Sequence, residues 1–459
     1  MKKTLVFVFS LVLIFGLLVG CAKAPESSNA PAEGNAAGPD AAEPQNDSGT
    51  APAAGEQVKI RFSGWGGPEE KDVFTKLLQS FESKNPDIKV EYIHVPADYT
   101  GKMNTVLAGG NAPDVFYVPD GDFGRWVSTG LLLNLQSMVD GSGINIGDMW
   151  ESGLNRYKYD GQNLGQGDLY ALPKDIGPTV LYYNKKLFDD AGVPYPSAET
   201  PMTWEQLVEI GKKLTKDTNG DGKPDQYGIG PIWWEGFVRA NGGEVLNESR
   251  TEFILNSKEA TDALQFAADL RYKYGISPDS RALQAMNDGQ MFETGKLAMQ
   301  IQGRWQVPAY RKLDFDWDVA PLPTGGKWNG WSGSVGFSVY SKSKNPEAAF
   351  KLIEYLAGEE GQKLQSELGF AIPNFKSMAD SDVFLQPGQK PANAQVFIKA
   401  AENQAAGPWT YTPNNKWWDI VNQKIGQLWD GKKTAVELMN EIKPEVDKAL
   451  REGNPQLFQ

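Results

Sequence analysis

Tryptophan is the residue type whose placement in this chain most suggests a binding chemistry. The chain holds 14 tryptophans. A flat indole ring can stack on the C–H face of a carbohydrate, while neighbouring polar side chains hydrogen-bond the hydroxyls. The alternative is that the rings fill core gaps and anchor loops. The tryptophans that stand near glycine or proline, or in pairs, are Trp65, Trp233, Trp234, Trp305, Trp328, Trp331, Trp409, Trp417 and Trp418.

A second pattern, in residues 217–225, resembles a calcium loop. Oxygen-bearing side chains stand at positions 1, 3, 5 and 9, and glycine stands at position 6. Position 12 is Gly228, where a calcium loop carries a bidentate glutamate. The alternative is a polar surface turn. The predicted ligands of a structural calcium ion are Asp217, Asn219, Asp221, Lys223 and Asp225.

Other chemistries find less support in the residues. A glycosidase needs two acids that flank a bond, and the sequence alone does not show such a pair. The glycines around Trp65 lack the Lys-Ser/Thr of a nucleotide loop. With His94 as its one histidine, the chain is poorly supplied for two-histidine metal sites and for Ser-His-Asp catalysis. The formal net charge of −13 argues against nucleic acid.

The elements that would position these residues alternate between strands and helices. Val58, Ile60 and Phe62 alternate as a strand, and Pro68 then opens a helix. The apolar run 115–118 predicts a central strand of a parallel sheet, buried on both faces. Alternation of this kind predicts an α/β fold.

Ligands of open α/β sheets lie beyond the carboxyl ends of strands. This rule selects Trp65 after the first strand, and Asp120 and Asp122 after the run 115–118. Further helices are predicted over 259–274, 346–356, 417–428 and 434–450, the last kinked or restarted at Pro444.

The N-terminus resembles a bacterial lipoprotein signal. Lys2 and Lys3 precede an apolar run, and Cys21 follows it as the single cysteine of the chain. Residues 1–20 are therefore predicted to be a signal peptide and Cys21 to be lipidated. The alternative is an ordinary signal peptide with an incidental cysteine. The rest of 21–56 is rich in Ala, Pro, Gly and Ser, which predicts a disordered spacer between the anchor and the fold.

Several stretches between residues 57 and 459 resemble the extracellular solute-binding proteins of ABC sugar importers, the class that includes maltose-binding protein. Their order and spacing together carry the resemblance. The stretches are Ala112-Pro113-Asp114-Val115-Phe116, Gly130-Leu131-Leu132, residues 170–175 (YALPKD), residues 181–188 (LYYNKKLF), Ala240-Asn241-Gly242-Gly243, residues 292–299 (FETGKLAM) and Leu322-Pro323.

The resemblance implies a two-lobe periplasmic-binding-protein-like fold (type II), with an interlobe hinge and a ligand cleft. By position, lobe 1 would be 57–170 plus 318–372, and lobe 2 would be 175–312 plus 375–459. The cleft aromatics would be Trp233 or Trp234, Trp305 and Trp417. Asn184 is expected to cap a helix. Trp65 and Trp331 are also expected to contact the ligand, although the glycine-rich loop around Trp331 has no close counterpart in the family.

We therefore expect a monomeric, membrane-tethered receptor that captures a carbohydrate, specifically an oligosaccharide, and delivers it to an importer's permease. It would need no cofactor and would make or break no bond. Hydrogen bonds to the sugar are expected from Asp120, Asp175 and Arg304. A surface glycoside hydrolase, and a receptor for peptides or polyamines, are the alternatives.

Overall fold

The computed structural model describes residues 57–327 and 329–459. The predicted signal peptide, Cys21 and the spacer to residue 56 lie outside the described residues. Across the described part of the chain, none of the helices is both long enough and apolar enough to cross a membrane.

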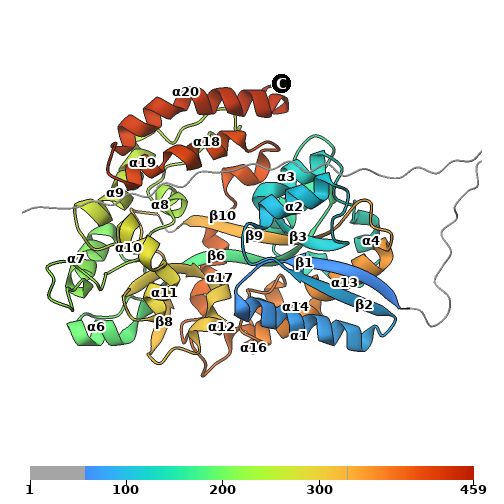
Figure 1. The fold of residues 1–459 in the computed structure, drawn as a ribbon, viewed down its shortest axis with the longest axis horizontal. Coiled ribbons are helices and arrows are strands. Elements are labelled where there is room, and N and C mark those ends of the chain that lie inside the picture. Colours follow the sequence, from blue (N-terminus) through green and yellow to red (C-terminus); the bar gives the residue numbers. More distant parts are fainter. Residues whose placement is uncertain (1–56, 328) are drawn as a thin grey trace, which may run out of the picture. The chain divides into compact units, whose positions relative to one another are not determined.

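Eight strands form one sheet, in the order β2-β1-β3-β9-β6-β7, with β10 paired to β9 and β8 paired to β6 (Figure 1). A separate hairpin pairs β4 with β5. The strands are β1 (Val58–Gly64), β2 (Ile88–His94), β3 (Val115–Pro119), β4 (Lys158–Tyr159), β5 (Asp168–Leu169), β6 (Leu172–Asn184), β7 (Met299–Gly303), β8 (Trp317–Ala320), β9 (Gly330–Val339) and β10 (Gln404–Ala405).

Strand β3 corrects one detail of the sequence prediction. Its residues 115–118 are buried, as predicted for a strand covered on both faces. The strand pairs in parallel with β1 but antiparallel with β9. The sheet is therefore mixed. Strand β9, which makes the antiparallel pair, lies more than 200 residues after β3 in the chain. Strand β9 also pairs antiparallel with β6, so it joins β3 to β6.

Within residues 57–327 and 329–459, twenty α-helices surround these strands. The first ten are α1 (Pro68–Lys84), α2 (Tyr99–Ala108), α3 (Asp120–Ser128), α4 (Gln136–Asp140), α5 (Glu151–Leu154), α6 (Lys185–Ala191), α7 (Trp204–Leu214), α8 (Trp234–Ala240), α9 (Lys258–Tyr272) and α10 (Ser280–Ala285). The others are α11 (Asp288–Glu293), α12 (Val307–Tyr310), α13 (Pro346–Ala357), α14 (Glu359–Glu367), α15 (Lys376–Ala379), α16 (Asp382–Leu385), α17 (Gln395–Asn403), α18 (Lys416–Lys424), α19 (Gly426–Trp429) and α20 (Ala435–Gly453).

Short 3-10 helices complete the chain. They are η1 (Ile146–Asp148), η2 (Asn155–Tyr157), η3 (Arg304–Gln306), η4 (Pro408–Tyr411) and η5 (Pro455–Phe458).

Local signals in the sequence set several helix boundaries. Pro68 begins α1, which buries one apolar face. Asn184 caps α6 by accepting a hydrogen bond from the Leu187 amide, as expected. Helix α20 runs as one element through Pro444, so of the predicted kink or restart the restart is wrong, and the kink stays a prediction. In the segment 227–230, Tyr227 makes an isolated bridge with Leu297.

The apolar interior consists of four clusters. The first contains buried residues from 60–172 and 337–375. The other three draw on residues between 176 and 450. Val319 and Leu322, which the prediction assigned to lobe 1, pack in two of these later clusters. The division into two hinged lobes stays a prediction.

Candidate functional site

Five tryptophans form a continuous row of neighbouring rings. From one end to the other they are Trp305, Trp233, Trp331, Trp409 and Trp418, and we call them the tryptophan row. The successive ring centroids are 6.1, 5.5, 5.6 and 4.5 Å apart. These separations are those of directly interacting aromatic pairs.

The row is assembled from five separate elements. Trp305 lies in η3 directly after β7, Trp233 caps α8, and Trp331 lies in β9. Trp409 lies in η4 and Trp418 in α18. All but Trp409 are half-buried, so their rings are partly accessible. A partly exposed indole bordering a cavity is the kind of surface on which a sugar ring stacks.

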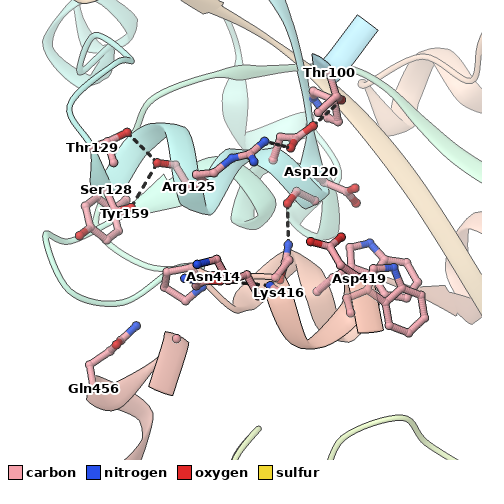
Figure 2. A pocket seen from close by; sticks show the side chains of 18 of the residues that line it. Thr100, Asp120, Arg125, Ser128, Thr129, Tyr159, Asn414, Lys416, Asp419 and Gln456 are labelled. Carbon is pink, nitrogen blue, oxygen red and sulfur yellow. Dashed lines mark hydrogen bonds and ion pairs between the residues drawn. The ribbon is translucent and has the colours of Figure 1, made fainter. Parts of the chain in front are cut away.

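The Trp409–Trp418 end of the row borders a pocket of about 890 Å³. This volume lies in the range of small-molecule sites, about 300–1,000 Å³. Figure 2 shows Asp120 and Arg125 of α3 on one side of the pocket, and Lys416 and Asp419 of α18 on the other. Tyr159, at the end of β4, and Gln162, in the turn between β4 and β5, also line it.

Asp120 lines this pocket, as predicted, but its carboxylate is already held by the protein. Its Oδ2 lies 2.5 Å from Arg156 Nη1, and the Thr410 hydroxyl donates to it at 3.3 Å. Burial raises the pKa of Asp120, and the positive charge of Arg156 opposes that rise. Arg156 also donates two hydrogen bonds to Ser332, each 2.7 Å long.

Asp122 is a second acid of the pocket. The Thr100 hydroxyl donates to its carboxylate at 2.7 Å, and Arg125 Nη2 lies 2.5 Å from it. Burial raises the pKa of Asp122 as well. Because both acids of α3 have basic partners, this wall of the pocket presents hydrogen-bonding groups with little unbalanced charge.

Five of the predicted site residues lie outside both the row and the pocket, namely Trp417, Arg304, Asp175, Trp65 and Trp234. Trp417 is fully buried, and its indole N–H donates to Thr412 at 3.2 Å. Arg304 is also buried, 4.6 Å from the ring of Phe384, and its Nη2 donates to the Phe384 carbonyl at 3.2 Å. Burial lowers its pKa to about 9. Neither side chain offers a surface to a ligand in this conformation.

The third such residue, Asp175, lies on β6 in a buried ion cluster. Its Oδ2 is 2.9 Å from Lys174 Nζ, which is also 3.1 Å from Glu70 Oε1. Burial lowers the pKa of Lys174, but the two carboxylates outweigh it and the net shift is upward. The group therefore ties the start of β6 to α1.

The two remaining predicted aromatics are close to the site elements. Trp65 is half-buried, and its ring meets those of Tyr99 and Tyr117 edge-on, at 4.8 and 4.9 Å. Trp234 is buried behind the row, 5.6 Å from Trp418. Of the six predicted aromatics, Trp233, Trp305 and Trp331 thus belong to the row.

The sequence prediction missed Trp409 and Trp418 as site residues. Trp409 follows Gly407-Pro408, the same kind of context that selected the other tryptophans. Helix geometry could have selected Trp418. Trp417 and Val421 are four residues apart and share the buried face of α18, so Trp418 lies off that face. No pattern in the sequence indicated that Arg156 and Arg125 are the basic partners of Asp120 and Asp122.

Carboxylates of the loop 217–225 accept hydrogen bonds from backbone amides of the same loop. Asp217 accepts hydrogen bonds from the amides of Gly220 and Gly222, each at 2.7 Å, and Asp225 accepts one from Thr218 at 2.7 Å. In the part of the chain that the structure describes, no three His, Cys, Asp or Glu side chains gather as a metal site. A Cβ at Gly228 would clash with the backbone of α7, so no glutamate fits position 12. The donor set is thus incomplete by the standard of a full calcium loop, and calcium binding stays a prediction.

Comparison with known proteins agrees with this architecture. The chain is 24% identical over 341 residues to the galactooligosaccharide-binding protein of Bacillus subtilis, covering 70% of this chain and 74% of that protein. It is 27% identical over 342 residues to the arabinooligosaccharide-binding protein of Halalkalibacterium halodurans, covering 68% and 71%.

Among solved structures, the fold matches an ABC substrate-binding protein of Listeria monocytogenes in complex with cycloalternan. The TM-score is 0.78 at 24% identity, with 86% of this chain and 99% of that chain covered. The model of the family described as bacterial extracellular solute-binding protein matches residues 67–363. This match spans more than half of the chain, so the protein belongs to the bacterial extracellular solute-binding proteins and is a binding protein rather than an enzyme.

Proposed function

We propose that this protein captures an oligosaccharide at the tryptophan row and its adjoining pocket, and delivers it to the permease of an ABC importer. The observation that carries the proposal is the row itself, five neighbouring indoles whose Trp409–Trp418 end borders a polar pocket of about 890 Å³. Two relatives that match most of the chain are binding proteins for galactooligosaccharides and arabinooligosaccharides.

The polarity of the pocket supports a neutral, hydroxyl-rich ligand. Sugar rings would stack on the half-buried indoles, and their hydroxyls would meet the polar groups of α3 and α18. A polyamine receptor would need several unpaired carboxylates that converge on the site. Here Asp120 and Asp122 are each 2.5 Å from an arginine, which disfavours that alternative.

Capture would work through closure around the ligand. The pocket has one wall from α3 and another from η4 and α18, which are almost 300 residues apart in the chain. Asn415 donates to the Gly121 carbonyl at 2.6 Å across this junction. A ligand that contacts both walls favours the conformation in which they are close together, which is how a binding protein couples capture to domain closure. A lipid on Cys21 would keep the receptor at the membrane beside its permease.

Intrinsic tryptophan fluorescence tests the proposal. The purified full chain in detergent is titrated with galactobiose, arabinotriose, maltotriose and, as a cationic comparison, spermidine. Because two indoles of the row line the pocket and the other three follow them along the row, we expect a saturable change in emission with at least one oligosaccharide and none with spermidine. No response to any sugar by fluorescence or calorimetry contradicts the proposal. Radiolabelled palmitate incorporation, abolished in Cys21→Ala, tests the anchor.

A further inference from the structure

The first turn of α8 is enclosed by the tryptophan row. Trp233, its N-cap, lies 6.1 Å from Trp305 and 5.5 Å from Trp331 between ring centroids. Two residues after Trp234, a Cβ built on Gly236 would come within 3.7 Å of the Trp331 backbone nitrogen. Residues on both sides of Glu235 therefore contact the row or the strand that carries it.

The helical repeat indicates the direction in which Glu235 points. Residues four apart share one helix face, so Glu235 lies one turn before Arg239. Arg239 Nη1 donates to the Ala406 carbonyl at 3.4 Å. Ala406 lies between β10, which pairs with β9 at Trp331, and η4, which carries Trp409. The face of α8 that bears Glu235 is thus turned toward the segment between two members of the row.

Unlike Asp120 and Asp122, but like Asp419 of α18, Glu235 has no basic partner among the described residues. Its side chain is half-buried, and burial raises its pKa to about 7 without any contribution from a neighbouring charge. Arg239, on the same helix, lies 3.1 Å from Glu244 instead.

Charged residues on the elements around α8 do not compensate Glu235. Strand β9 and residues 404–411 carry none. Those on α9 and α18 are Lys258, Glu259, Asp262, Asp269, Arg271, Lys416, Asp419 and Lys424.

Several buried polar atoms on or beside the elements that carry the row lack a partner within the described residues. They include Trp331 Nε1, a donor, Asn329 Oδ1, an acceptor, and Arg304 Nε and Nη1, both donors. Buried polar groups are normally hydrogen-bonded, so unmatched ones on the elements of an aromatic row indicate places where a ligand or ordered water completes the hydrogen bonding. Trp331, Asn329 and Glu235 are all half-buried, so each residue retains some exposed surface.

We propose that Glu235 is a specificity-determining residue of the sugar site, whose carboxylate accepts hydrogen bonds from hydroxyl groups of the bound carbohydrate. This inference rests on the proposed function. A carboxylate has two oxygens and can accept from two adjacent hydroxyls at once. Charge-assisted hydrogen bonds of this kind are about twice as strong as neutral ones. The residue would therefore select sugars that present a hydroxyl pair to α8.

The pH profile of sugar affinity is the decisive measurement. With a pKa of about 7, the ionised fraction of Glu235 changes about tenfold between pH 6 and pH 8. If the ionised form is the acceptor, the affinity of the wild-type protein for the best sugar of the panel rises up to about tenfold over that interval. The variant Glu235→Gln keeps the shape of the side chain but cannot ionise, so its affinity is expected to stay flat and low.

Glu205→Gln is the matched control. Helix α7 begins Trp204-Glu205 just as α8 begins Trp234-Glu235, but Glu205 is exposed. Its replacement removes the same charge from the same helix position and should leave the affinity and its pH profile unchanged. The acids of α3 also have raised pKa values, so the difference between wild type and Glu235→Gln is the readout.

The outcomes separate the two proposals. If no sugar binds the wild-type protein, the proposed function fails and this inference fails with it. If sugar binds, but Glu235→Gln keeps the wild-type affinity and profile, only the role of Glu235 is refuted. A flat profile for the wild-type protein also refutes that role, and this measurement needs no variant to fold.

Discussion

Trp417 and Trp418 are neighbours in the chain, but they belong to different parts of the molecule. Trp417 is fully buried among the apolar residues between α18 and α20, whose packing is visible in Figure 1. Trp418 is half-buried, stacks on Trp409 at 4.5 Å and lines the pocket. A helix turns by about 100° per residue, so adjacent side chains point to different surroundings. Tryptophan content alone therefore identifies no site, and the face of the element decides which rings are available.

The largest expected effect separates these two rings by stability. Trp417→Ala should lower the free energy of unfolding by about 3–5 kcal/mol, because it removes a large core side chain and leaves a cavity. Trp418→Ala should lower it by about 1 kcal/mol, the value of an aromatic contact. Urea unfolding of both variants measures the difference, and Trp417→Phe covers the case in which the alanine variant does not fold. Equal losses for the two alanine variants would contradict the assignment of Trp418 to the site.

The next largest effect concerns the stability contributed by a buried ion pair rather than by an aromatic ring. Asp120 lines the pocket, yet Arg156 holds it as a buried ion pair. Arg156→Met should lower the free energy of unfolding by about 3 kcal/mol, because it leaves a buried carboxylate unpaired. The double variant Arg156→Met/Asp120→Asn should recover part of that loss, which a double-mutant cycle measures.

The sign of the pH dependence follows from the pKa of Asp120. Burial already raises that pKa in the folded protein, and loss of Arg156 removes the interaction that lowers it. A group with a raised folded pKa loses stability as pH rises from its unfolded pKa toward the folded one. The deficit of Arg156→Met relative to wild type should therefore shrink as pH falls and Asp120 takes up a proton. A deficit that is the same at pH 5 and pH 8 would show that lost packing, not charge, is the cause.

A smaller effect concerns ligand affinity. Trp418→Ala should weaken sugar binding about tenfold, which corresponds to about 1.4 kcal/mol of lost stacking. Trp429→Ala serves as the control, because that half-buried indole lies on α19 and does not line the pocket. Calorimetric titration with the best sugar of the panel gives both affinities. An unchanged affinity in Trp418→Ala would restrict the site to the other end of the row.

Most of the fold could be predicted from local patterns. The alternation at Val58, Ile60 and Phe62 and the helix start at Pro68 are confirmed. The place of β9 could not be predicted in the same way. Its sequence, GWSGSVGFSV, is rich in glycine and serine, and its pairing with both β3 and β6 depends on contacts between distant segments.

The candidate site was less predictable, for the same physical reason. Glycine and proline contexts found three rings of the row, because loops at the ends of strands are where ligand-facing residues lie. They did not show that Arg304 turns toward Phe384, which is 80 residues away. The spacing of Trp417 and Val421 did indicate a buried helix face, and weighing it would have favoured Trp418.

The smallest expected effect lies away from both tryptophans. If the loop 217–225 holds calcium, it does so without a position-12 glutamate and hence weakly. A ligand at ten times its dissociation constant stabilises by about 1.4 kcal/mol, so a few millimolar calcium should raise the midpoint of thermal unfolding by about 1–2 °C in a chain of this size. Asp221→Asn should reduce that shift, because Asp221 is exposed and its loss removes a ligand charge without touching the core. Sugar affinity in Asp221→Asn should remain at the wild-type value. An equal shift with magnesium, or none with calcium, would leave the loop as a turn whose carboxylates serve only its own amides.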